Sequence, residues 1–230
     1  GKGQGHYVIK QDFAEEWLHA VTPEVYINLQ WPATMRDKDE FNNAVSPFSG
    51  VTNTAGLLKR SFSSKASQIK YDPSRSPGKF PAHGGFYINT YEPSPIKGEP
   101  GDTTLWTDFI EMLLPEEEDR KHLYNWAATL IARPDRRIPY GVLLVSEVQG
   151  IGKSTLGERI LAPLVGEGNV SFPSENEIVD SNFNSWLAHK RLAVVHEIYS
   201  GHSSKAYNKL KTIVTDRQIR VNEKYLKNYQ

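Results

Sequence analysis

The chain has 230 residues, 38% of them hydrophobic, which is enough to bury a core in one large domain or two small ones. Its 27 basic and 27 acidic residues cancel, and this excludes a histone-like basic protein and a purely acidic tail. Cysteine is absent, so disulfides, thiolate zinc sites and a cysteine nucleophile are also excluded. No apolar run approaches the roughly 18 residues of a membrane span, and the N-terminus has no apolar signal core.

The N-terminal hundred residues contain few periodic stretches. A helix is predicted at residues 11–20, where Phe13, Trp17 and Leu18 fall on one side. Between Leu57 and Tyr91 the sequence is basic and rich in Ser, Gly and Pro. This composition predicts basic loops that lead into a single strand at residues 85–90.

Two helices are predicted after Pro95. Asp102 and Thr103 can cap the first, which ends at Pro115, and the second begins with four acidic residues at 116–119 and ends at Arg133 and Pro134. The buried stripe expected for the first helix is Leu105, Phe109, Met112 and Leu113, and that for the second is Leu123, Trp126, Ala127, Leu130 and Ile131.

From Ile138 onward the pattern changes to strand, glycine loop and helix. The apolar run at residues 142–145 is typical of a strand buried on both faces of a parallel sheet, and residues 192–195 form a second such run. The helix between them is marked by Leu156, Ile160, Leu161 and Leu164. This order of elements predicts an α/β domain.

The glycine loop reads E-V-Q-G-I-G-K-S-T over residues 147–155. A loop that joins a strand to a helix aims backbone N–H groups and the positive helix end at one anion. Lys153 can then reach the β and γ phosphates of a nucleotide, and Ser154 can place its hydroxyl on Mg²⁺. The predicted nucleotide-binding residues are Gln149, Gly150, Ile151, Gly152, Lys153, Ser154 and Thr155.

The loop departs from the strict pattern G-x-x-x-x-G-K-[ST] at its first position, where Glu147 replaces glycine. The competing interpretation is a glycine turn with an exposed lysine. The predicted strand before the loop and helix after it favour the nucleotide-binding hypothesis.

Glu197 follows the second apolar run, so it is expected at the carboxyl edge of the sheet, where ligands of open α/β sheets bind. There it can polarise the water that attacks the γ-phosphate or hold the magnesium shell. A metalloprotease zinc site is rejected, because His196 and His202 are six residues apart rather than four. The remaining alternative is that Glu197 only caps the segment that follows.

Several signatures in order give residues 85–230 a resemblance to the superfamily 3 helicase region of phage and plasmid primase-helicases and primase-polymerases. They are F-Y-I-N-T-Y-E-P at 86–93, D-F-I-E-M-L-L-P-E-E-E at 108–118, H-L-Y-N-W-A-A-T-L-I-A-R-P at 122–134, the phosphate loop, and S-N-F-N-S-W-L-A-H-K-R-L-A-V-V-H-E-I at 181–198. The resemblance implies an AAA+-like ATPase that uses ATP and Mg²⁺, assembles as a ring, usually of six, and moves along DNA. The resemblance also allows for a primase or polymerase module on the same chain.

By this resemblance, Lys153 and Glu197 are the catalytic residues, and Ser154 and Glu197 are the metal contacts. The family often has a second acid before the catalytic base, where this chain has His196. Residues 209–225 resemble the hairpin that reaches the central channel, which makes Lys224 and Tyr225 the expected contacts to single-stranded DNA.

Charge also varies along the chain in a way that bears on nucleic acids. Residues 101–180 carry 7 basic and 14 acidic side chains, whereas residues 181–230 carry 9 and 3. The C-terminal excess suits a polyanion, as does an earlier basic run with aromatic neighbours between Lys59 and Lys79. That earlier run lacks the positional support that the resemblance gives to Lys224.

The predicted fold is therefore α/β: a P-loop AAA+-like parallel-sheet ATPase core at 137–230, cut before its sensor strand, after a helical lead-in at 102–136 and a loop-rich, partly basic accessory region at 1–101. The predicted function is that of an ATP-dependent DNA helicase or translocase in phage or mobile-element replication. Its expected location is the cytoplasm, away from membranes. The alternatives are a P-loop phosphotransferase acting on a small molecule and a nucleotide-binding ring or adaptor that does not hydrolyse.

Overall fold

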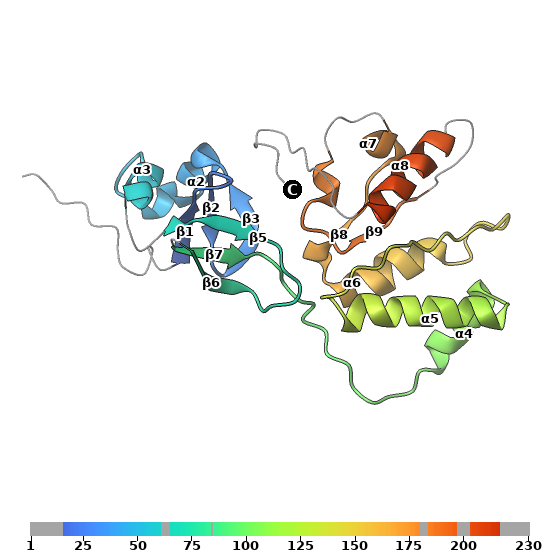
Figure 1. Ribbon diagram of the computed structural model, residues 1–230. Coiled ribbons are helices and arrows are strands. Elements are labelled where there is room, and N and C mark those ends of the chain that lie inside the picture. Colours follow the sequence, from blue (N-terminus) through green and yellow to red (C-terminus); the bar gives the residue numbers. More distant parts are fainter. Residues whose placement is uncertain (1–15, 61–64, 84, 180–183, 197–202, 217–230) are drawn as a thin grey trace, which may run out of the picture. The chain divides into compact units, whose positions relative to one another are not determined.

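The computed structural model describes residues 16–60, 65–83, 85–179, 184–196 and 203–216 of the chain. The chain divides into two compact units, residues 1–92 and residues 93–230 (Figure 1). Both units mix helices with short strands. In the described ranges, no helix is both long enough and apolar enough to cross a membrane.

Unit 1 is built on two small sheets. In its described part, a four-stranded sheet has the order β3-β2-β1-β4, antiparallel except for the β1–β4 pair. Helices α2 and α3 pack on this sheet, and Tyr26, Phe41 and Leu58 are buried between them. The elements are β1 (Trp17–Ala20), β2 (Val25–Asn28), β3 (Trp31–Arg36), α2 (Lys38–Val45), the 3₁₀ turn η1 (Ser46–Phe48), α3 (Thr54–Arg60) and β4 (Lys65–Ala66).

The second sheet of unit 1 has the order β5-β7-β6 within the described residues. Its strands are β5 (Gln68–Lys70), β6 (Gly78–Ala82) and β7 (Gly85–Asn89). The central strand β7 pairs in parallel with β5 and antiparallel with β6. Its residues Tyr87, Ile88 and Asn89 are all buried, so this strand is the core of the sheet.

Two predictions for unit 1 were wrong in part. Residues 17–20 of the expected helix 11–20 form strand β1, because backbone pairing with the β-branched and aromatic strand β2 overrides the local helical spacing. Phe13 lies outside the described residues. The strand expected at 85–90 is confirmed as β7, but the basic region before it also holds α3, β4, β5 and β6 rather than loops alone.

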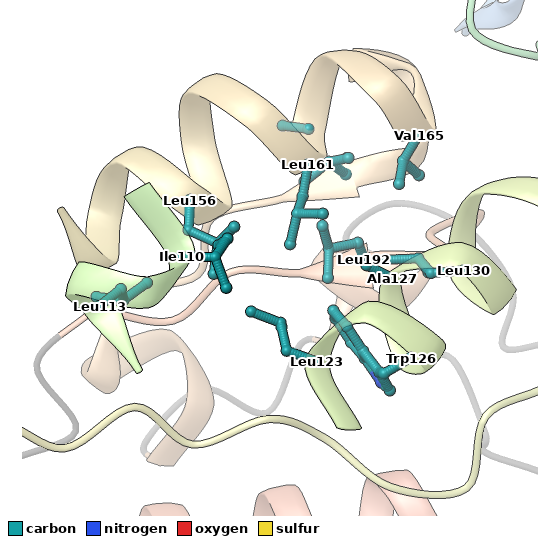
Figure 2. Close-up of a cluster of buried hydrophobic side chains, with 12 residues drawn as sticks. Ile110, Leu113, Leu123, Trp126, Ala127, Leu130, Leu156, Leu161, Val165 and Leu192 are labelled. Atoms are coloured by element: carbon teal, nitrogen blue, oxygen red, sulfur yellow. The ribbon is translucent and has the colours of Figure 1, made fainter. Parts of the chain in front are cut away.

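Unit 2 begins with α4 (Thr104–Leu113) and α5 (Glu117–Ala132). The remaining elements are the π-helix η3 (Thr155–Leu161), α6 (Ala162–Val165), η4 (Glu167–Asn169), β8 (Val170–Ser171), α7 (Glu175–Val179), η5 (Ser185–Leu187), β9 (Leu192–Ala193) and α8 (Ser203–Thr215). Figure 2 shows the main core, where Ile110 of α4, Trp126 of α5, Leu156 of η3 and Leu192 of β9 converge.

Helix α5 was predicted correctly, and the phase of α4 was not. On α5, Leu123, Trp126, Ala127 and Leu130 are buried as expected, although Ile131 is exposed. On α4, Leu105 and Met112 of the expected stripe are exposed, whereas Ile110 and Leu113 are buried and Trp106 and Phe109 pack at the edge of the core. Hydrophobic residues lie on two faces of α4, so spacing alone did not identify the buried face.

The parallel sheet of unit 2 is smaller than predicted. Strands β8 and β9 pair in parallel over two residues each. The strand predicted at residues 192–195 is therefore only half as long in the structure, where β9 ends at Ala193. Residues 142–145 form no strand, and Leu143 and Val145 are 67% and 76% exposed. An extended segment needs a neighbour for its backbone groups, and no described strand pairs with this one. The described chain is thus mixed α/β without the extended parallel core that was expected.

The phase of α4 can be tested by two truncations on the same helix. Ile110 is fully buried and Leu105 is 89% exposed. We expect Ile110→Ala to lower the free energy of unfolding by about 2–5 kcal/mol, through lost burial and a cavity. Leu105→Ala should change it by less than about 0.5 kcal/mol. Denaturant unfolding of both variants measures the difference, and a loss in Leu105→Ala as large as that in Ile110→Ala would contradict the burial seen in the structure.

Candidate nucleotide-binding loop

The loop before η3 owes its shape to two glycines. Gly150 and Gly152 have φ angles of 76° and 96°, a left-handed conformation that side chains with a Cβ rarely adopt. The Ser146 hydroxyl braces the start of the loop, donating to the Val148 carbonyl at 3.1 Å and accepting from the Val148 N–H at 3.0 Å. Glu147 has an ordinary negative φ and is exposed, so the missing first glycine is not needed for this backbone.

Gly152 also allows a close approach by α4. A Cβ placed on Gly152 would lie 2.6 Å from Cε2 of Phe109. Ile151, on the other hand, is half-buried and packs against the main core, so its side chain anchors the loop. The two neighbouring residues therefore fix the loop between α4 and the core.

Lys153 and Ser154 follow the second glycine, at the start of the helical segment. The Lys153 ammonium donates to the Val148 carbonyl at 3.3 Å, so its side chain lies back across the loop. The peptide that follows is helical at once, with the Leu156 N–H donating to the Gly152 carbonyl at 3.0 Å. Leu156 and Leu161 are both buried, and the Ala162 N–H donates to the Gly157 carbonyl, the five-residue spacing of π-helical hydrogen bonds.

The end of β9 reaches the same helix. A Cβ on Gly157 would lie 2.7 Å from Cγ1 of Val194, so the glycine lets this helix and the segment after β9 touch. The Val194 N–H donates to the Ser171 carbonyl at 2.8 Å and extends the sheet pairing by one bond. This packing brings His196 next to the glycine loop.

Three polar side chains meet there: Ser154, His196 and Glu158. The Ser154 hydroxyl oxygen lies 3.4 Å from His196 Nδ1, and His196 Nε2 lies 2.7 Å from Glu158 Oε1. The second contact has the distance of an ion pair but not the alignment of a hydrogen bond. A carboxylate beside Nε2 favours a proton on that nitrogen, which leaves Nδ1 free to accept from Ser154. Neither Glu158 nor this link was predicted from the sequence.

The segment before β9 is fixed to the rest of the unit by two basic residues, Arg191 and Lys190. Arg191 donates to the Leu130 carbonyl at 3.1 Å and to the Arg136 carbonyl at 3.0 Å, around the C-terminal end of α5. Lys190 donates to the Gly168 carbonyl at 2.7 Å. His189 has a φ of 57°, and burial together with the charge of Lys190 lowers its pKa to about 4.

The structure thus brings the seven predicted loop residues together and places His196 beside them. Gln149 and Thr155 are exposed at the two ends of this stretch. Glu197, Lys224 and Tyr225 lie outside the described residues, so their roles stay predictions. Within the described part of the chain, no group of three His, Asp or Glu side chains could hold a metal. Of the two predicted magnesium contacts, Ser154 and Glu197, the structure describes Ser154.

Comparison with known proteins gives a fold and leaves the activity open. Residues 144–230 match the model of a family of unknown function, DUF5906. No curated protein matches the chain. Two solved structures of the C-terminal region of NrS-1, both without ligand, match with TM-scores of 0.70 and 0.73 at 22% and 20% identity, over 92% and 93% of this chain. The chain spans about half the length of those structures, covering 50% of each.

The fit between Gly152 and Phe109 gives a stability prediction. Gly152→Ala should lower the free energy of unfolding by about 1–3 kcal/mol, because the alanine Cβ meets the ring in a strained conformation. Gly168→Ala is the matched control, since nothing lies within 4 Å of that site and its φ is ordinary. Adding Phe109→Ala to Gly152→Ala should cost less than the sum of the two changes. Strict additivity in denaturant unfolding would contradict the contact.

The lowered pKa of His189 predicts a pH-dependent stability. Its pKa is about 4 in the folded chain against 6.5 as the reference, so the unfolded chain binds the extra proton between these values. The free energy of unfolding should therefore fall as the pH drops from about 6.5 to about 4, by up to about 3 kcal/mol. His189→Asn keeps a residue that tolerates the left-handed backbone and should flatten this profile.

The profile is measured by denaturant unfolding at several pH values. The exposed His122, on α5, provides the control variant His122→Asn, which should leave the profile as it is. An unchanged slope in His189→Asn would show that this histidine is not responsible.

Proposed function

We propose that the chain carries the nucleotide-binding part of an ATP-driven DNA helicase or translocase of the superfamily 3 type, which acts in phage or mobile-element replication. One observation supports this most directly: the glycine loop, its lysine and serine, and the end of β9 lie at one place in unit 2. The fold similarity to the NrS-1 C-terminal region and the ordered helicase-like signatures agree with it.

In this proposal the loop binds the triphosphate of ATP. The backbone N–H groups between Gln149 and Thr155 and the Lys153 ammonium supply positive charge to the phosphates. Lys153 would exchange its 3.3 Å bond to the Val148 carbonyl for the β and γ phosphates. Packing of the half-buried Ile151 against the core would keep the loop in place while the lysine moves.

Mg²⁺ would be held by the Ser154 hydroxyl together with Glu197, and it would neutralise charge on the phosphates. The Ser154 environment fits this role. A hydroxyl can donate its hydrogen to His196 Nδ1 and still offer an oxygen lone pair, and Glu158 holds the imidazole from its other side. Glu197 would orient and deprotonate the attacking water.

The remaining parts of the proposal concern assembly and DNA. We infer a parallel-sheet AAA+-like core in which residues 142–145 become a strand when a neighbouring strand is present. Ring formation, usually of six subunits, would place further copies of the chain beside this site. Lys224 and Tyr225 would contact single-stranded DNA in the central channel.

Replacing the loop lysine tests the nucleotide site. In the protein at its full natural length, Lys153→Ala should weaken binding of a fluorescent ATP analogue and reduce DNA-stimulated ATP turnover to background. Lys121→Ala, which removes an exposed lysine from α5, should behave as the parent protein. Unchanged DNA-stimulated hydrolysis in Lys153→Ala would contradict the assignment.

The companion variant Glu197→Gln separates binding from chemistry. It should keep nucleotide binding and lose at least about a hundredfold in turnover, since glutamine keeps the size and hydrogen bonding of the side chain but cannot act as the base. Equal loss of binding would show that Glu197 is structural or mainly a metal ligand. A parent protein that binds ATP and never hydrolyses it would favour the adaptor alternative. Turnover that responds to a small-molecule acceptor and not to DNA would favour the phosphotransferase.

A further inference from the structure

Unit 1 contains a segment whose charges are strongly one-sided. Between residues 59 and 79 the sequence has six basic side chains and one acidic one, Asp72. Lys59 is neutralised by an ion pair with Glu24, and Arg75 lies 3.5 Å from Asp72. In the part of the chain that the structure describes, Lys70 and Lys79 pair with no carboxylate. This segment therefore presents uncompensated positive charge.

The cations of this segment lie over aromatic rings of the β5-β7-β6 sheet. The Lys70 ammonium is 4.5 Å from the centre of the Tyr87 ring, and the Arg75 guanidinium is 5.4 Å from that of Phe80. Phe80 and Tyr87 are opposite each other in the strand register and stack with their centres 5.5 Å apart. Lys70, Arg75, Phe80 and Tyr87 thus form one surface, here called the cationic sheet face.

The arginine of this face is held in position before any ligand binds. Its Nη1 donates to the Tyr87 hydroxyl at 2.8 Å, and Tyr87 itself is buried beneath it. The loop that carries Arg75 is braced by Asn89, a fully buried side chain whose amide nitrogen lies 2.9–3.0 Å from the carbonyl oxygens of Asp72, Arg75 and Ser76.

The same Asn89 accepts from the Asp72 N–H at 2.9 Å, which closes the loop on the strand. A guanidinium has five N–H donors, and the contacts to Tyr87 and Asp72 leave others for an outside acceptor. Holding the side chain in advance lowers the entropy cost of binding an anion.

We propose that the cationic sheet face binds the sugar-phosphate backbone of single-stranded DNA. Lys70 and Arg75 are exposed and would contact phosphates, and the half-buried Phe80 ring would contact a base. The surface and its charge are observed independently of the proposed function, and only the choice of DNA over other polyanions rests on it. The residues of this face all belong to unit 1, whereas the predicted contact Lys224 belongs to unit 2. The proposal therefore gives unit 1 a role in binding the strand.

The test is binding of a fluorescent oligo-dT to the full-length protein without nucleotide, over a series of salt concentrations. The double variant Lys70→Gln/Arg75→Gln removes two phosphate contacts. We expect it to bind at least about tenfold more weakly, with the slope of log affinity against log salt reduced by about 1.4. Lys38→Gln, an exposed lysine of α2 flanked by two aspartates, is the control and should bind as the parent.

Two further measurements keep the result interpretable. Thermal unfolding of the double variant should match the parent, and Arg75→Lys, which keeps the charge but not the Tyr87 bond, should lie between the two in affinity. Parent-like DNA affinity and salt slope in the double variant would overturn the proposal. Loss of binding only in Lys224→Ala, or a parent that binds acidic polypeptide and no DNA, would overturn it as well.

These outcomes are distinct from failure of the nucleotide proposal. ATP turnover that depends on Lys153 can persist in the double variant whatever its DNA affinity. The binding assay contains no nucleotide, so its result does not depend on whether the loop of unit 2 binds ATP.

Discussion

The candidate site depends on close packing at two glycines. Gly152 lets the Phe109 ring approach the loop, and Gly157 lets Val194 approach the helix that follows. A side chain at either position would meet a neighbour at 2.6–2.7 Å, so the loop, α4 and the end of β9 can come together only with these residues. The same contacts set His196 beside Ser154, which links the packing of unit 2 to the chemistry proposed for it.

The sequence predicted elements well where one pattern dominated. Helix α5 has a single apolar face and an acidic first turn, and strand β7 is short, apolar and bounded by glycine, so both were found. The elements that were predicted wrongly depend on contacts with other parts of the chain. Strand β1 carries helical spacing but pairs with β2, and residues 142–145 carry a strand pattern but have no partner among the described residues. The buried face of α4 depends on where α5 and η3 lie, which spacing does not encode.

The sequence likewise predicted some parts of the candidate site and missed others. The loop at 147–155 stood out in the sequence because glycine, lysine and serine at this spacing before a helix are typical of an anion-binding turn. Glu158 and Ser146 have no such signature, and they matter through contacts that form only in the folded chain. Asn89 stands within the F-Y-I-N-T-Y signature, and the structure gives it a physical role, since it fixes the loop that carries Arg75. Composition had shown the basic run between Lys59 and Lys79 without showing which of its members share a surface.

The proposed function requires that the loop at 147–155 binds a nucleotide phosphate. Hydrogen–deuterium exchange of the full-length protein, with and without a non-hydrolysable ATP analogue and Mg²⁺, addresses it most directly. We expect slower exchange at the backbone amides of residues 149–156, with a further slowing when Mg²⁺ is added and little change in α5. Exchange in the loop that is unaffected by saturating nucleotide, or protection confined to unit 1, would contradict it.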